Sequence, residues 1–184
     1  VKGFCTFSNV ISNYAPIAYN ASDEECNQTF FKALEFVEGH LSRLRSRLMH
    51  FQQSRETVRK TMEEFEGQDC LIFNEAVSWM ENFFAMGGED HKALFVIMPS
   101  GDQWKLRGIP PNMEQRMQVR LDLPLEWAGL LEEDLKDVSK IDGAVFCHKG
   151  RFISVWGTKE DALEALEYTL KHYRKIVEES DGTG

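Results

Sequence analysis

The chain has 184 residues, of which 42% are hydrophobic and 28% charged, and its formal net charge is −9. This length can bury one sizeable core or two small ones, and the composition is that of an ordinary globular protein. An acidic chain repels polyanions as a whole, so a nucleic-acid partner would need a local basic patch. No apolar run approaches the roughly 20 residues needed to cross a bilayer, so we expect no membrane partner.

The first residues show neither an initiator Met nor the layout of a signal peptide, and we expect a piece of a longer protein. No Cys-x-x-Cys occurs, which argues against a zinc ribbon or a thioredoxin-like motif. Widely spaced cysteines without a signal peptide predict reduced, buried thiols in a cytoplasmic protein. These cysteines are Cys5, Cys26, Cys70 and Cys147.

Residues 30–66 carry the clearest secondary-structure pattern. Apolar residues recur at steps of three and four from Phe30 to Phe65, which predicts one face of a long helix ending at Gly67. Residues 20–27 are polar and predict a loop that supplies the N-cap, and Gly39 is a candidate kink. The mean step near 3.5 fits either an intramolecular core or a homodimer seam.

The elements that follow are short. Strands are predicted at 70–73, 93–98, 103–109, 117–123, 144–148 and 151–155, and helices at 75–86, 125–130, 131–139 and 159–179, the last capped by Thr158. Residues 93–109 and 144–155 read as hairpins. The predicted fold class is therefore α+β, with a long N-terminal helical segment before a small mixed, mainly antiparallel sheet with flanking helices.

Familiar catalytic motifs are missing from the sequence. The histidines lack metal-ligand spacing, and neither a Gly-x-Ser-x-Gly nor a phosphate-binding glycine loop occurs. What remains is a polar cluster around His148, beside a helix N-terminus whose free N–H groups favour anions. The candidate phosphate-binding residues are Arg120, His148, Lys149, Arg151, Thr158 and Lys159.

Trp156 is the candidate for stacking on a base. A structural interpretation of the same cluster also fits. In it His148 satisfies a loop carbonyl, Lys149 and Arg151 form ordinary hairpin surface, and Trp156 belongs to the core.

The sequence LPLEWAGL at 123–130 is followed by Phe146-x-His148, by Phe152-Ile153 and by the Thr158 cap. This order resembles the C-terminal signature of the MYG (melanocyte proliferating gene) family, in the Asp-His-His (DHH) phosphoesterase superfamily. The resemblance implies a 3′-to-5′ RNA exonuclease or related phosphoesterase that depends on manganese. It also implies an N-terminal domain that holds the metal and a C-terminal domain that clamps the nucleotide.

No Asp-His-His occurs in this chain, so the resemblance implies the C-terminal portion only, with no catalytic or metal-binding residue. Residues 1–90 would be a linker and long-helix segment, and 91–184 the substrate-binding domain. Arg120 and His148 match the family pattern as phosphate contacts. Where the family usually has Gly-Gly, this chain has Ser154 and Val155, whose Cβ atoms narrow the approach of backbone to a phosphate.

The expected partner is single-stranded RNA or a nucleotide, bound together with the catalytic half. Two alternatives stay open. The chain could be a non-catalytic dimerisation or regulatory module that associates through residues 30–66 and has a degenerate binding loop. It could also be an enzyme acting on a small acidic metabolite.

Overall fold

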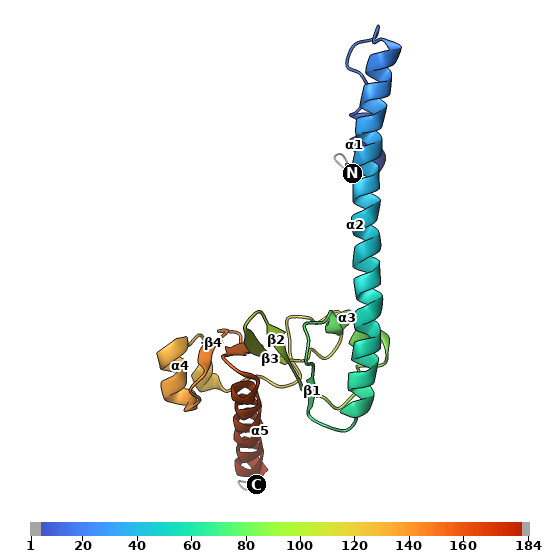
Figure 1. The fold of residues 1–184 in the computed structure, drawn as a ribbon. Coiled ribbons are helices and arrows are strands. Elements are labelled where there is room, and N and C mark those ends of the chain that lie inside the picture. Colours follow the sequence, from blue (N-terminus) through green and yellow to red (C-terminus); the bar gives the residue numbers. More distant parts are fainter. Residues whose placement is uncertain (1–4, 182–184) are drawn as a thin grey trace. The chain divides into compact units, whose positions relative to one another are not determined.

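The structure is a computed structural model that describes residues 5–181, with side chains as far as Arg174 (Figure 1). Contacts divide the chain into two units, Val1–Gln52 and Gln53–Gly184. Helix α2, Asp23–Glu64, runs from the first unit into the second. The predicted functional division at residue 90 stays a prediction.

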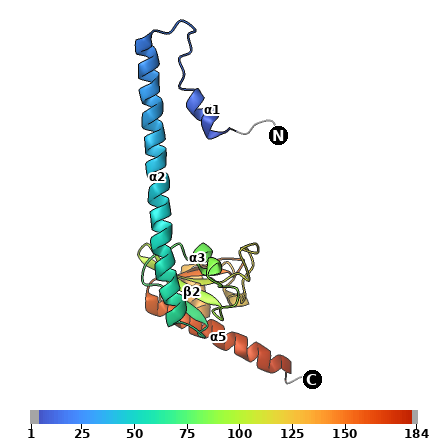
Figure 2. The same cartoon turned by 90° about the vertical axis from the view of Figure 1, so that its right-hand side faces the viewer.

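The first unit contains α1, Phe7–Ser12, and most of α2. The predicted long helix is confirmed, but it begins at Asp23, within the stretch expected to be a loop. The reason is a capping box, in which the Ser22 hydroxyl accepts from the Glu25 N–H and the Glu25 carboxylate accepts from the Ser22 N–H. Helix α2 is continuous, and its part in the first unit runs straight (Figures 1 and 2), so the kink expected at Gly39 is wrong.

The apolar stripe of α2 has two different environments. Val58 is fully buried in the second unit, as the core interpretation requires. Further towards the N-terminus Phe30, Leu41 and Leu48 are 61%, 55% and 65% exposed. The core interpretation therefore holds for the end of the helix, and a homodimer through the exposed stretch stays a prediction.

Within residues 53–181, five strands form one mixed sheet in the order β1-β2-β3-β5-β4. The pair β1–β2 is parallel, and the other neighbours are antiparallel. This confirms the α+β class and both predicted hairpins. The strands are β1 Cys70–Ile72, β2 Phe95–Ser100, β3 Gln103–Gly108, β4 Ala144–Cys147 and β5 Ile153–Trp156.

Helices lie on both faces of this sheet, and Figure 2 shows α3 and α5 on opposite sides of it. One core joins Phe95, Leu106 and Trp156 to α5. The other joins Val96 and Met98 to α2 and α3. Successive side chains of β2 point to opposite faces of the sheet, so the strand contributes to both cores. The helices of this unit besides α2 are α3 Trp79–Ala85, η1 Leu125–Trp127, α4 Glu132–Ser139 and α5 Lys159–Asp181.

The strand predicted at Met117–Leu123 is wrong. This stretch has no strand structure, although single backbone bonds join Arg120 N to Ile109 O and Leu123 N to Arg151 O. Both edges of β3 are already paired, with β2 and β5, so the alternating segment finds no free edge there. The helix predicted at 125–130 shortens to Leu125–Trp127, since Gly129 takes a positive φ of 79°.

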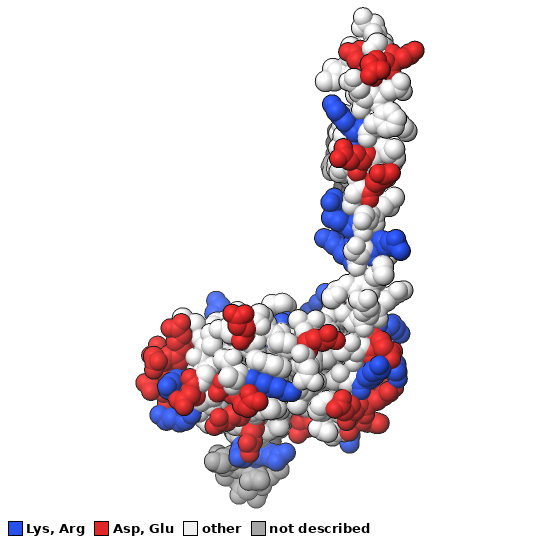
Figure 3. Space-filling model, viewed as in Figure 1, with Lys and Arg blue, Asp and Glu red and all other residues white. Residues whose placement is uncertain are grey.

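Among the residues that the structure describes, no helix is both long enough and apolar enough to cross a membrane. Acidic side chains gather over α4, which begins with Glu132, Glu133 and Asp134 (Figure 3). The acidic side chains of α4 therefore disfavour an anionic ligand on this helix itself.

Candidate functional site

The turn between β4 and β5 carries the first group of predicted site residues. His148 is half-buried, and its Nδ1 accepts a hydrogen bond from the Gly150 N–H at 2.9 Å. In the neutral ring this bond assigns the proton to Nε2, which is then a donor. The ring packs on Phe152 with centroids 4.5 Å apart. Lys149 is exposed, so the turn offers a ring N–H and an ammonium group.

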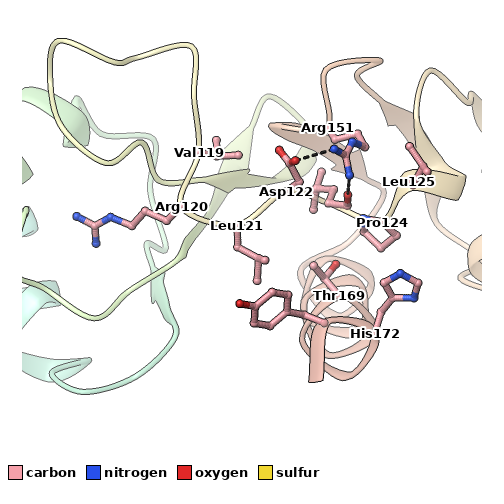
Figure 4. A pocket seen from close by; sticks show the side chains of 11 residues that line it. Val119, Arg120, Leu121, Asp122, Pro124, Leu125, Arg151, Thr169 and His172 are labelled. Atoms are coloured by element: carbon pink, nitrogen blue, oxygen red, sulfur yellow. Dashed lines mark hydrogen bonds and ion pairs between the residues drawn. The ribbon is translucent and has the colours of Figure 1, made fainter. Parts of the chain in front are cut away.

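Arg151 lies in the same turn but faces a different group. Its backbone is left-handed, with φ 55°, and its guanidinium donates to the Asp122 carboxylate at 2.6 Å and to the Leu123 carbonyl at 3.2 Å (Figure 4). The Asp122 charge neutralises much of the cation. Arg151 therefore anchors residues 122–123 to the turn, and a phosphate would have to compete with Asp122.

Arg120 points away from this turn, as Figure 4 shows. Its guanidinium donates to the carbonyls of Gly88, Glu89, His91 and Ala93, at 2.6, 3.2, 2.6 and 2.8 Å. It also lies 5.7 Å from the centre of the Phe83 ring. Burial lowers the pKa of Arg120, and the Glu89 charge partly offsets this. These contacts hold the loop at residues 88–93 in place. The role of Arg120 as a phosphate contact stays a prediction.

Thr158 and Lys159 lie at the other end of β5 from His148. The predicted cap is confirmed, because Asp161 N donates to the Thr158 hydroxyl and the Asp161 carboxylate accepts from the Thr158 N–H at 2.8 Å. The N-terminus of α5 thus already holds a carboxylate of its own. Lys159 Nζ donates to Asn74 Oδ1 at 2.8 Å and lies 5.6 Å from the Trp104 ring centre.

Trp156 is fully buried, and its Nε1 donates to the Ser154 hydroxyl at 2.8 Å. Its ring also packs edge-on against Trp127. The core interpretation is correct for this residue, and a base cannot reach the ring. Ser154 is buried on the same face, so at the expected Gly-Gly position only Val155 is directed to the other face.

The predicted cluster therefore separates into three groups, which are the turn with His148, Lys149 and Arg151, then Arg120, and then Thr158 with Lys159. An open pocket of about 470 Å³ is lined by both Arg120 and Arg151, although the Arg120 guanidinium is bound to the carbonyls of residues 88–93. It contains residues that the sequence did not single out, among them Asp122 and His172. Asp122 could have been found from the sequence, because it is an acidic residue directly before Leu123-Pro124. His172 could not, because only the position of α5 in the fold brings it to this pocket.

A polar contact lies beside His172. The Tyr168 hydroxyl donates to Glu126 at 3.1 Å, and His172 Nδ1 lies 3.6 Å from the same carboxylate. Burial, followed by the bond to Glu126, raises the pKa of Tyr168. The hydroxyl is the donor in this contact at neutral pH, as that of an ordinary tyrosine would be.

No group of three or more His, Cys, Asp or Glu side chains that could hold a metal occurs among the described residues. Cys70 and Cys147 are buried as predicted, whereas Cys5 and Cys26 are exposed, which corrects that expectation. The exposed pair lies in the first unit, where few side chains are covered. Burial raises the pKa of Cys147 to about 12, so this thiol is inert at neutral pH.

A sequence model of the family described as uncharacterised protein family UPF0160, named for the MYG1 exonuclease, matches residues 2–170. The MYG1 protein of Chlamydia pneumoniae is 48% identical over 172 residues, covering 92% of this chain and 57% of that protein. The MYG1 protein of Chlamydia trachomatis serovar D is 44% identical over 175 residues, covering 95% and 59%. The human MYG1 exonuclease is 28% identical over 165 residues, covering 83% and 43%.

No solved structure matches the chain. The chain spans somewhat more than half the length of the chlamydial relatives and less than half of the human one. The family match covers most of the sequence, including both hairpins and the turn at His148. The chain therefore belongs to the MYG1 family.

Proposed function

We propose that this chain is the C-terminal, substrate-binding part of a metal-dependent phosphoesterase of the DHH superfamily that trims RNA from the 3′ end. The observation that carries the proposal is the family match over residues 2–170, together with human and rat relatives that are named exonucleases. The chain's contribution is to hold nucleotide phosphate. The natural setting in this proposal is the cytoplasm.

The residues that would hold the phosphate are His148 and Lys149. The His148 Nε2–H has no partner among the described residues, and Lys149 is exposed at the tip of the turn. Both can donate to a phosphate oxygen, and the ring is held in place by Gly150 and Phe152. Arg151 has the lesser role of fixing the turn through Asp122.

A divalent metal such as manganese would activate water in the parent protein. The described residues of this chain do not fit such a metal, because they bring no set of three ligands together. In the proposal the metal is therefore held outside this chain, and no catalytic step is assigned to its residues.

The test is the binding of a short labelled single-stranded RNA, measured by fluorescence anisotropy at low and moderate salt. We expect binding that weakens with salt, because phosphate contacts release counterions. His148→Ala and Lys149→Ala should each lower the affinity about tenfold, as the loss of a charged hydrogen bond requires. Lys171→Ala is the matched control, because this exposed lysine is paired with Glu167 on α5.

A second candidate function is a dimerisation module, and the exposed stripe on α2 favours it. Sedimentation velocity would show a dimer that Leu41→Glu and Leu48→Glu dissociate, with no RNA affinity even at low salt. RNA binding that is lost in the turn variants but kept in these α2 variants contradicts the module. Binding that does not depend on RNA length would instead favour a small acidic metabolite as substrate.

A further inference from the structure

Strand β3 places two cations side by side on one face of the sheet. Leu106 is fully buried in the core beneath α5, and Trp104 packs against that core. Because side chains alternate along a strand, Lys105 and Arg107 lie together on the opposite face. The register sets Lys105 between Met98 and Val155, and Arg107 between Val96 and Ile153.

Neither cation is neutralised. The side chains of Lys105 and Arg107 form no ion pair or hydrogen bond with any other described residue, and Arg107 Nε is buried without a hydrogen-bond partner. The guanidinium lies 5.7 Å from the centre of the Phe152 ring, a cation–π contact that supplies no negative charge. Arg107 therefore carries an uncompensated charge in a half-buried position, which is unfavourable.

The electrostatics agree with this geometry. Burial lowers the pKa of Arg107, and burial followed by the Arg107 charge lowers the pKa of Lys105. The Arg107 charge therefore disfavours the charged form of Lys105, and the folded protein carries this repulsion at neutral pH. A bound anion would remove it.

The surroundings form a floor for a ligand. Phe146, Ile153 and Val155 are half-buried, and none of them belongs to either core. We name Lys105, Arg107, Phe146, Ile153 and Val155 the basic face. Phe152 connects it to the turn, since its ring contacts both Arg107 and His148. The basic face and the proposed substrate turn are thus continuous.

We propose that the basic face is a phosphate-binding site, in which Lys105 and Arg107 hold the phosphate group of a phosphate ester. The two neighbouring cations supply the charge that a phosphate needs, and the apolar floor limits competition from water. The phosphate site adds a second contact to the function proposed above. It rests on that function only for the identity of the natural ligand, which would be RNA or a nucleotide.

The experiment titrates the full chain with inorganic phosphate and with adenosine monophosphate, against chloride at equal ionic strength, by calorimetry and thermal unfolding. We expect both phosphates to bind and to raise the unfolding temperature. Arg107→Gln should lower the affinity at least tenfold, and Lys105→Gln about tenfold. The control Lys171→Gln should leave it unchanged. Tighter binding of the nucleotide identifies an ester as the source, and equal binding identifies free phosphate.

Stability without ligand separates this proposal from a structural role. Lys105→Gln removes the repulsion, so it should unfold at the same temperature as the wild type or higher while binding phosphate less well. Unchanged phosphate affinity in both variants overturns the proposal. RNA binding that survives Arg107→Gln while phosphate binding is lost refutes RNA as the ligand of the basic face and leaves the proposed function standing. Phosphate binding that needs Arg107, in a chain without RNA affinity, supports the site and refutes the RNA function.

Discussion

Replacing Arg120 by Met tests whether this residue holds the fold together or binds a ligand. The substitution keeps an apolar stem but removes the donors to four backbone carbonyls of residues 88–93. The bonds to Gly88, His91 and Ala93 are partly buried, and the bond to Glu89 is exposed. At about 1 kcal/mol for each partly buried bond, the expected loss is about 3 kcal/mol. For a domain of this size that lowers the unfolding temperature by about 10 °C.

Urea unfolding followed by tryptophan fluorescence measures this loss. Arg116→Met is the matched control, because its guanidinium is exposed and lies 3.9 Å from Glu81. It should change the free energy of unfolding by less than about 0.5 kcal/mol. If Arg120→Met unfolds at the wild-type urea concentration and instead loses phosphate affinity, Arg120 is a ligand-binding residue and the structural assignment fails.

Two further predictions concern a helix cap and the cysteines. Gly143→Ala should destabilise the protein by about 1–3 kcal/mol, because the new Cβ would overlap the Asp161 carboxylate and displace it from the α5 cap. Urea unfolding measures this loss, and an unfolding midpoint equal to that of the wild type would contradict the contact. With a thiol reagent at pH 8, the exposed Cys5 and Cys26 should react fast, while Cys70 and Cys147 should react only on unfolding. The reason is that burial hides both of the latter thiols from the reagent and raises their pKa. Rapid modification of all four cysteines would refute that burial.

Local patterns predicted the second unit well where neighbours in sequence are also neighbours in space. The hairpins and the Thr158 cap depend on residues a few positions apart, and all of them are present. The alternation at Met117–Leu123 is as regular as that of β3, yet this stretch forms no strand. The difference lies in pairing with distant segments, because β3 is paired with both β2 and β5 whereas residues 117–123 pair with no strand.

The candidate site was less predictable for the same reason. His148 and Thr158 are close in sequence, but β5 lies between them and spans roughly 13 Å at 3.3 Å per residue. The carbonyls that hold Arg120 come from a loop far back in the chain, with no signal in the sequence around Arg120. The strand predicted at 103–109 implies that Lys105 and Arg107 share one face, but it cannot show whether an acidic side chain pairs with them.

The strand order has a consequence for how the sheet assembles. Hairpins β2–β3 and β4–β5 each close over a short turn, but the row of pairs from Trp104–Trp156 to Arg107–Ile153 joins residues about fifty positions apart. Closing that loop costs more chain entropy than either hairpin, and contacts distant in sequence slow folding. We therefore expect the β3–β5 pairing to limit the folding rate, so that substitutions along it slow refolding while those in the hairpin turns mainly speed unfolding.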